Sequence, residues 1–306
     1  MREVAISVVI PVKNGQRYLD EVLKAIFSQE IKREFEVVIV DSGSTDRTLD
    51  IIGQYPVRFY QIKENEFNHG LTRNLGISKA QGKYIILLTA DAIAYDQCWM
   101  RKLIEHLERD SRVAGSYSRQ IPHKDSQPLS RIRVKNSLTF SKERRESQIK
   151  KKEDYFALSP EEKRRFCNFD NVSSCLRKEV WKKVPFPKTD FAEDLEWSKA
   201  VIEAGHKIIY EPESIVYHSH DFSLPEWYRK NRINYKTLYT LFGIEVINNF
   251  SQLIKFFFIS TLWDIYYLCK DARGGKAILS NIWLIPLHSL WRALGHYRGV
   301  NEAKKR

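Results

Sequence analysis

Short apolar runs alternate with amphipathic stretches over about the first 118 residues. Runs of β-branched and other apolar residues at 4–11, 35–40, 57–62 and 84–88 predict strands, and the last of these is apolar throughout, as in a strand buried on both faces. Between them, apolar residues recur at helical spacing within 15–29, 48–52 and 69–80, and Gly82 is expected to end the last helix. This alternation predicts an α/β fold with a largely parallel sheet and helices on both faces.

Two of the predicted strands end on a carboxylate, Asp41 and Asp91. In open α/β sheets the ligand binds beyond the carboxyl ends of the strands, and a charge there is costly unless it is paired. We therefore expect the two acids at neighbouring strand ends to mark a site, although Asp91 alone could equally cap a turn. The first strand–helix turn has no Gly-x-Gly-x-x-Gly motif, which argues against a dinucleotide-binding fold.

The pattern changes after residue 120. Residues 120–165 are rich in Lys and Arg and poor in apolar residues, which favours a solvated, mobile loop with some helix over a lid on an anionic substrate. A helix is expected from 191 to 205, with Glu193 and Asp194 in its first turn. Two short strands are expected at 208–210 and 215–217, and His218 and His220 follow the second.

The last third of the chain predicts helices with a different character. Residues 222–242 are amphipathic and basic, and 250–269 and 278–294 are rich in aromatic and aliphatic residues beside Lys and Arg. No stretch reaches the roughly 20 consecutive apolar residues of a spanning helix. The composition favours helices that lie in a membrane interface over a hairpin packed on the domain or on a second subunit.

Composition limits the possible classes of protein. The 306 residues are 43% hydrophobic and carry a formal net charge of +12, which indicates a folded chain suited to phosphate-bearing ligands, anionic lipid or nucleic acid. The four cysteines show no Cys-x-x-Cys spacing, so neither a zinc site nor a redox pair is expected. With no signal-peptide pattern after Met1, we expect a cytoplasmic protein, peripheral on the inner face of the cell membrane.

Four motifs in order carry a family resemblance, and an acidic pair follows them. The chain resembles inverting family 2 glycosyltransferases of the GT-A fold over roughly residues 4–222. The motifs are VIPVKN at 9–14, VIVDSGSTDRT at 38–48, FNHGLTRNLG at 67–76 and LTADA at 88–92. The resemblance implies a catalytic domain at 1–222, followed by a helical, membrane-associating region at 223–306.

Within that family, the chain is most similar to bacterial rhamnosyltransferases. The residues that carry this similarity are Phe-Asn-His-Gly, Thr-x-Asp-Ala, Asn171 to Ser174, His218 to Asp221 and the aromatic C-terminal helices. The implied donor is a dTDP- or UDP-linked sugar, with dTDP-rhamnose favoured. The implied acceptor is a saccharide or lipid-linked saccharide of surface polysaccharide or O-antigen, and an oligomer is possible.

The resemblance also implies roles for individual residues. Asp194, paired with Glu193, would be the catalytic base, for which plain helix N-terminal charge is the alternative. Asp91 would hold a divalent cation, Mg²⁺ or Mn²⁺, with His218 or His220 as a further ligand. Asp41 would bind the pyrimidine imide and Arg73 the diphosphate. The full set of expected donor-binding residues is Pro11, Lys13, Asn14, Asp41, Arg73, Asn74, Ala90 and Asp91.

Two departures from the family pattern affect these expectations. Thr89 stands where the family's first Asp of Asp-x-Asp would be, which removes one carboxylate, so metal binding would depend on Asp91, the histidines and water. The Gln-x-x-Arg-Trp signature of processive synthases is missing, which favours transfer of one or a few sugars. A sugar-phosphate nucleotidyltransferase is an alternative. Such enzymes usually have a Gly-rich, basic loop near the N-terminus, and residues 12–15 match that loop poorly. A nucleic-acid-binding protein is disfavoured because the basic residues lie in the segment 120–165 and in the C-terminal region, and not among exposed aromatic residues on one face of a sheet.

Overall fold

The computed structural model describes residues 4–189, 191–271 and 282–305. The chain forms two compact units. The first unit comprises the segments up to residue 120, 138–156 and 166–218, and the second comprises 121–137, 157–165 and 219–306. The second unit therefore includes two segments that precede residue 222 in the chain.

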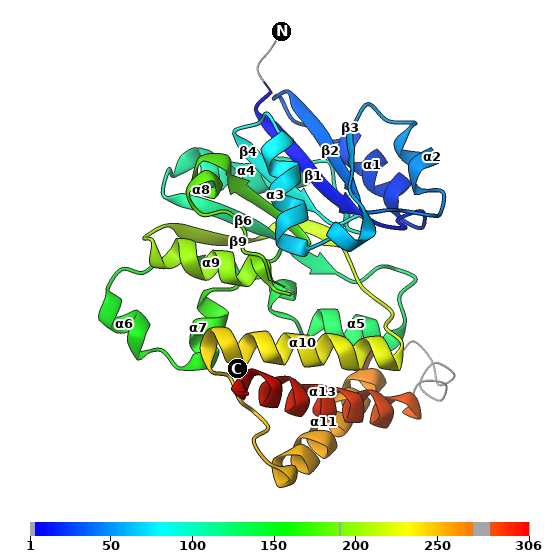
Figure 1. The fold of residues 1–306 in the computed structure, drawn as a ribbon, viewed down its shortest axis with the longest axis vertical. Coiled ribbons are helices and arrows are strands. Elements are labelled where there is room, and N and C mark those ends of the chain that lie inside the picture. Colours follow the sequence, from blue (N-terminus) through cyan, green and yellow to red (C-terminus); the bar gives the residue numbers. More distant parts are fainter. Residues whose placement is uncertain (1–3, 190, 272–281, 306) are drawn as a thin grey trace. The chain divides into compact units, whose positions relative to one another are not determined.

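A mixed sheet forms the centre of the first unit (Figure 1). Among the described residues it has nine strands in the order β3-β2-β1-β4-β8-β6-β9-β5, and β7 pairs with β9. The strands are β1 Ile6–Val12, β2 Phe35–Asp41, β3 Arg58–Gln61, β4 Tyr84–Leu88, β5 Ile93–Ala94, β6 Val113–Ile121, β7 Arg145–Ser147, β8 Ser173–Arg177 and β9 Lys207–Tyr217. The helices that accompany it are α1 Leu19–Phe27, α2 Thr48–Ile52, α3 His69–Lys79, α4 Trp99–Arg109, α6 Lys152–Ala157, α8 Lys178–Lys183 and α9 Glu193–Glu203. α7 Pro160–Phe166 belongs to the second unit except for its last residue.

The parallel arrangement predicted from the sequence holds for the first four strands. β1 pairs in parallel with β2 and β4, and β2 pairs in parallel with β3, because α1, α2 and α3 carry the chain back between them. β8 is antiparallel to both β4 and β6, and β5 and β7 are antiparallel to β9. The two short strands expected at 208–210 and 215–217 are one strand, β9. Asp41 and Asp91 do not follow neighbouring strands, because β1 lies between β2 and β4.

The two faces of β1 bury different helices. Ile6, Val8, Ile10 and Val12 lie in one hydrophobic cluster with the apolar stripes of α1 and α4. Val9 points to the other face, where Gly76 of α3 lies against it. Gly82 is not the residue that ends α3, which stops at Lys79. A side chain there would come within 2.6 Å of the Ile6 backbone, so close packing against β1 requires the glycine.

Substitution of Gly76 by alanine is expected to lower the free energy of unfolding by about 1–3 kcal/mol, because the new methyl group would overlap Val9 and crowd Val40 in a packed core. Gly53→Ala is the matched control. Gly53 has an ordinary helical φ of −62° and only normal contacts beyond 3.4 Å, so its replacement should be neutral or slightly stabilising. Urea unfolding of the full chain measures both. Equal effects of the two variants would contradict this view of α3 packing.

The second unit is helical. Its main elements are α5 Pro128–Lys135, α10 Leu224–Phe242, α11 Phe250–Asp271 and α13 Leu284–Lys304. α10 and α13 run side by side in Figure 1, and Gly295 and Gly299 let the two backbones approach closely. α11 packs on α13 in the opposite direction, since Leu253 meets Ala293 at one end and Leu268 meets Ile285 at the other. Residues 278–281 of the expected third helix lie outside the described residues.

The basic segment 120–165 contains more regular structure than the solvated loop with some helix that its composition predicted. It contains α5, β7, α6, most of α7 and a 3₁₀ turn at Leu138–Phe140. The sparse apolar residues are sufficient anchors: Leu129 and Ile132 pack against α11 and α13, and Tyr155 is buried in the first unit. Among the described helices, none combines the length and the apolar character needed to cross a membrane.

Candidate functional site

The loops that follow β1 and β2 are joined by hydrogen bonds at the carboxyl ends of these strands. The Asn14 backbone N–H donates to Ser44 Oγ over 2.8 Å, and Asn14 Oδ1 accepts from the Thr45 N–H over 2.8 Å. The Gly15 N–H donates to Thr48 Oγ1 over 2.7 Å. Asn14 has a positive φ of 50°, a conformation that asparagine tolerates better than most residues. The loops after β1 and β2, which contain the motifs at 9–14 and 38–48, therefore form one hydrogen-bonded rim at the carboxyl ends of these strands.

Asp41 is fully buried within this rim. Its carboxylate accepts hydrogen bonds from the N–H groups of Gly43 and Ser44, from the Ser44 hydroxyl and from Gln61 Nε2. Asp41 thus shapes the loop after β2. Its expected contact with a pyrimidine imide stays a prediction.

Three further residues of the expected donor pocket lie on or beside the same rim. Pro11 is a partly exposed residue of β1, and Ala90 lies close to Gly15. Lys13 forms an ion pair of 2.5 Å with the well-exposed Glu64. Lys13 therefore stands at the surface, where its ammonium can exchange this carboxylate for another anion.

Asp91 and His218 come together beyond the ends of β4 and β9. His218 Nε2 lies 3.7 Å from Asp91 Oδ2, too far for a hydrogen bond but suitable for two ligands of one ion. His218 Nδ1 lies 2.9 Å from Gln120 Oε1, a hydrogen-bond acceptor, so Nδ1 carries a hydrogen and Nε2 is the ring nitrogen that faces Asp91. His220 follows two residues along the chain, a span of at most about 7 Å, and completes a set of the kind that can hold a metal ion.

This donor set suits a divalent cation. Imidazole nitrogens beside a carboxylate suit Mn²⁺ better than Mg²⁺, which prefers oxygen ligands. Two polar atoms in this region are buried without a partner among the described residues: Thr89 Oγ1 and Gln120 Nε2. The single carboxylate of the Thr89-Ala90-Asp91 turn is thus supplemented by histidine rather than by a second aspartate.

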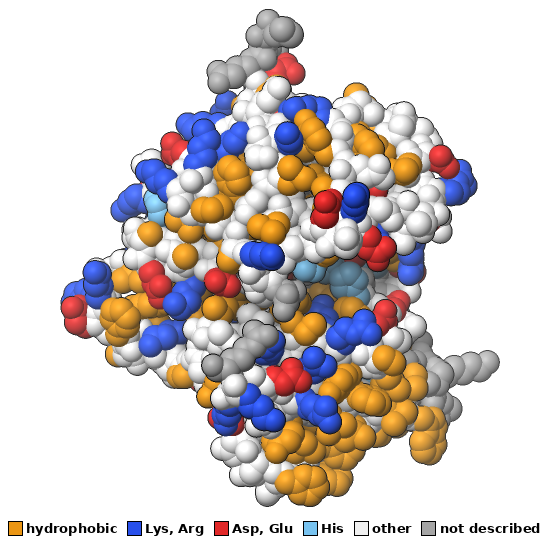
Figure 2. All heavy atoms as spheres, viewed as in Figure 1, with side chains coloured by type: hydrophobic (Ala, Val, Ile, Leu, Met, Phe, Trp, Pro, Cys, Tyr) orange, Lys and Arg blue, Asp and Glu red, His pale blue; other side chains and the backbone are white. Residues whose placement is uncertain are grey.

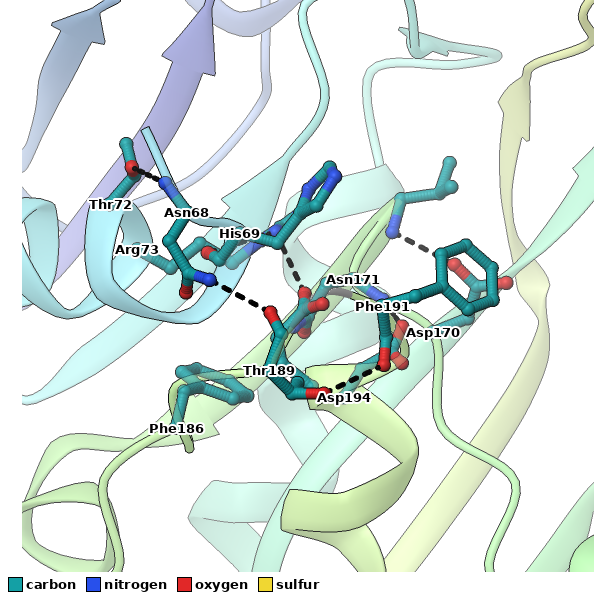
Figure 3. Close-up of polar contacts among 12 residues, drawn as sticks. Asn68, His69, Thr72, Arg73, Asp170, Asn171, Phe186, Thr189, Phe191 and Asp194 are labelled. Atoms are coloured by element: carbon teal, nitrogen blue, oxygen red, sulfur yellow. Dashed lines mark hydrogen bonds and ion pairs between the residues drawn. The ribbon is translucent and has the colours of Figure 1, made fainter. Parts of the chain in front are cut away.

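Asp194 lies in the first turn of α9 (Figure 3). Its Oδ2 accepts from the Asn171 N–H over 3.1 Å. Burial, the adjacent Glu193 and the nearby Asp170 raise the pKa of the Asp194 carboxyl to about 8. A carboxylate with such a pKa is a stronger base than an ordinary aspartate and can accept a proton near neutral pH.

One short segment links this carboxylate to the turn that carries Asp91. The Asn171 N–H donates to Asp194, and the carbonyl of the next residue, Val172, accepts from the Thr89 N–H over 3.0 Å. The two residues that precede β8 therefore bond both to Asp194 and to the Thr89-Ala90-Asp91 turn. The roles of Asp194 as the base and of Asp91 as a cation ligand stay predictions.

Glu193 and Arg73 differ from what the sequence suggested. Their side chains form a buried ion pair, with Arg73 Nη1 2.7 Å from Glu193 Oε1, and Asn171 Nδ2 donates to the same oxygen over 3.2 Å. Glu193 is thus engaged internally. Arg73, expected beside the diphosphate, is instead buried against an acid, and its Nε has no partner among the described residues.

Asn74 is also in a different environment from the expected nucleotide pocket. Its Oδ1 accepts from Trp181 Nε1 over 2.7 Å and from the Phe186 N–H over 3.1 Å, and its Nδ2 donates to the Phe186 carbonyl over 2.8 Å. These bonds use the carboxamide oxygen twice and one of the two hydrogens on Nδ2. The expected place of Asn74 in the donor site stays a prediction.

Sequence reasoning did not anticipate the contacts of Asn68 and Gly70. Asn68 caps α3 through its Oδ1 and donates from Nδ2 to the Thr189 carbonyl over 2.9 Å (Figure 3). Gly70 lies directly against the Pro187 carbonyl, where no side chain fits. The signal available in the sequence was an asparagine at a helix start with a glycine two residues later, which marks a cap and a close approach but not the partner.

The chain matches known glycosyltransferases by sequence. The family model described as glycosyl transferase family 2 matches residues 7–161. The O-antigen chain rhamnosyltransferase RfbN of Salmonella typhimurium is 33% identical over 229 residues, which are 74% of this chain and 69% of that protein. The O-antigen chain rhamnosyltransferase WbaN of Salmonella anatum is 32% identical over 200 residues, 64% of this chain and 60% of that protein.

A solved structure agrees on the fold. The mannosyltransferase PcManGT from Pyrobaculum calidifontis, solved in complex with GDP-Man and Mn²⁺, superposes with a TM-score of 0.59 at 16% identity, over 99% of this chain and 88% of that one. This confirms the predicted GT-A fold. The protein is a glycosyltransferase with rhamnosyltransferase relatives, and the chain belongs to glycosyl transferase family 2.

Proposed function

We propose that this glycosyltransferase transfers rhamnose from a pyrimidine nucleoside diphosphate, dTDP in particular, to a saccharide on a lipid carrier, with inversion at the anomeric carbon. The observation that carries the proposal is the partly buried Asp194 carboxylate, which Asn171 and Val172 connect to the Thr89-Ala90-Asp91 turn. The choice of rhamnose and of an O-antigen or surface-polysaccharide acceptor draws on the names of the two relatives.

A single general base on one side of the donor sugar is sufficient for direct displacement of the nucleoside diphosphate. Asp194 accepts the proton of an acceptor hydroxyl as that oxygen forms a bond to the anomeric carbon. The bond between this carbon and the diphosphate oxygen breaks, and the nucleoside diphosphate leaves. Because attack and departure occur on opposite faces, the configuration inverts without an enzyme-bound sugar.

Asp91, His218 and His220 are the residues that would hold a divalent cation. Such an ion neutralises charge on a leaving diphosphate. Pro11, Lys13 and Asn14 would line the nucleotide pocket together with the loop that Asp41 shapes, and the Lys13 ammonium would leave Glu64 for a phosphate oxygen.

A thermal-shift panel tests the donor assignment, because a ligand that binds only the folded state raises the melting temperature by mass action. We expect dTDP to give the largest shift, UDP a smaller one and GDP the smallest, each enlarged by Mn²⁺. A Lys13→Met variant should lose much of the shift. No shift with any nucleotide, or the largest one with GDP, would contradict the proposed donor.

The helical unit carries a broad apolar face that we assign to a membrane surface. Its large side chains are between 37% and 80% exposed and come from two packed helices and the residue before α13. They are Phe250, Ile254, Phe258, Ile259, Leu262, Trp263 and Tyr266 on α11 and Trp283, Leu284, Leu287 and Leu290 at α13. Figure 2 shows this hydrophobic surface over α11 and α13, with Lys and Arg side chains along its upper border.

Charge favours an anionic bilayer as the occupant of this face. Residues 250–306 contain nine Lys and Arg against three Asp and Glu. Aromatic and aliphatic side chains would enter the headgroup region while the basic residues meet lipid phosphates. A peripheral position on the inner face of the membrane would give the enzyme access to a lipid-linked acceptor.

Replacing Leu262 and Trp263 by glutamate should weaken binding to vesicles that contain phosphatidylglycerol by at least about 100-fold, since burial of each large apolar side chain contributes about 1.5–3 kcal/mol. Co-sedimentation measures this. Phe59→Glu, at an exposed position of β3, is the control and should bind normally. If the intact protein does not bind vesicles, the membrane assignment is wrong. If it forms a dimer that the double variant abolishes, the face binds a second copy of the chain.

A further inference from the structure

Four residues of α3 and its N-cap contact α9 or the chain before it. Asn68 Nδ2 donates to the Thr189 carbonyl, and the Asn74 carboxamide bonds the Phe186 backbone twice. Gly70 packs directly on Pro187, and Arg73 pairs with Glu193. Every one of these residues lies in the motif at 67–76. This motif therefore fixes the segment that presents Asp194.

We infer that α3 is the positioning element of the catalytic base, and that the buried Arg73–Glu193 ion pair sets the charge environment in which Asp194 works. Arg73 and Glu193 are positioning residues in this assignment, not groups that touch the donor or the acceptor. The inference rests on the proposed role of Asp194.

The geometry of Arg73 separates this role from diphosphate binding. Arg73 is 5% exposed, and its Nη1 serves both Glu193 Oε1 over 2.7 Å and the His69 carbonyl over 3.2 Å. Loss of the Glu193 pair would leave a buried charge without compensation. Arg73 therefore has an internal partner that a phosphate would have to displace.

The backbone conformation just before α9 is evidence that neighbouring contacts position this helix. Ala192, the residue before the helix, has a left-handed conformation with a φ of 60°, which is strained for a residue with a side chain. Such a conformation persists only where neighbouring contacts determine it. The ion pair of the next residue, Glu193, with α3 is one such contact.

The charges around Asp194 predict that substitutions of Glu193 and Arg73 shift its pKa in opposite directions. Glu193 on α9 and Asp170 before β8 raise the pKa of Asp194, and Arg73 on α3 lowers it. Glu193→Gln removes a negative charge and leaves Arg73 unpaired, so both effects favour the ionised base. Arg73→Gln removes a positive charge and leaves Glu193 unpaired, so both effects disfavour it.

The experiment is the pH profile of kcat/KM for transfer by the full chain, with dTDP binding measured in parallel by thermal shift. Wild-type activity should rise with pH as Asp194 ionises. Glu193→Gln should move this rise to lower pH and Arg73→Gln to higher pH, by about one unit each. dTDP binding should change less than about twofold in both, since neither residue touches the nucleotide.

Asn68→Ala is the matched control, because it removes an uncharged contact of the same segment. It should lower kcat without moving the rise. If Arg73→Gln fails to fold, Glu193→Gln alone decides the sign. Three results would overturn the inference. They are a shift of the rise in kcat/KM in the same direction in both variants, an unchanged pH profile in Glu193→Gln, and a strong loss of dTDP binding in Arg73→Gln. An active Asp194→Asn variant would instead overturn the proposed function.

Discussion

Asp194→Asn is expected to reduce the rate of sugar transfer by roughly 10²–10⁴-fold, the range typical of a lost general base. Asparagine keeps the size of the side chain and can still accept the Asn171 N–H, but it cannot take a proton from the acceptor hydroxyl. Nucleotide binding should be nearly unchanged, because Asp194 lies beside the reacting sugar in this account and not beside the base or the phosphates.

The measurement is initial-rate transfer at saturating donor, combined with the thermal shift produced by dTDP. Asp50→Asn, an exposed carboxylate on α2, is the control and should retain full activity. A variant that transfers normally would remove Asp194 from the catalytic role. Loss of nucleotide binding without a defect in turnover would place it in the donor pocket.

Asp91→Asn is expected to have the second-largest effect, a loss of transfer of at least about 100-fold together with loss of the Mn²⁺-dependent part of the nucleotide thermal shift. Asp91 is the only carboxylate in the Thr89-Ala90-Asp91 turn, so its charge cannot be supplied from within that turn. A cation held by His218 and His220 alone would bind more weakly, because hard cations prefer anionic oxygen ligands.

Titration with Mn²⁺, followed by its electron paramagnetic resonance signal, measures the metal site without reference to activity. The wild type and the Asp50→Asn control should bind Mn²⁺ equally in the presence of dTDP, and Asp91→Asn should not. If all three proteins bind it equally, the ion lies elsewhere. If none binds it and transfer proceeds without metal, Asp91 has a different role.

Local pattern predicted several of the elements that hold the site, among them β1, β2, β4, α3 and α9. The apolar run at 84–88 is β4, and the alternation before it gave the parallel half of the sheet. The antiparallel half was missed because β8, with the sequence Ser-Ser-Cys-Leu-Arg, lacks the apolar run that predicts a strand, and no strand was expected there. β9 was divided in two because Glu211, Pro212 and Glu213 interrupt its apolar pattern, although Glu211 is buried beside His106 and Arg144.

The partners of the site residues were harder to predict than the residues themselves. Arg73 was recognised as a functional arginine, but its partner Glu193 lies 120 residues further along the chain. Likewise, Asn68 was part of a recognised motif, while its contact with Thr189 spans 121 residues. Periodicity and motif order give the type of an element and the place of a residue within it, whereas these contacts depend on how β8 and α9 return to α3.

The most direct test of the account is the anomeric configuration of the product. The enzyme would be incubated with dTDP-rhamnose, Mn²⁺ and a panel of short polyprenyl-diphosphate saccharides, and the new linkage analysed by nuclear magnetic resonance. The account predicts release of dTDP and a rhamnosyl linkage of opposite configuration to that of the donor. A product with retained configuration, or transfer from a GDP-sugar and not from dTDP-rhamnose, would contradict it.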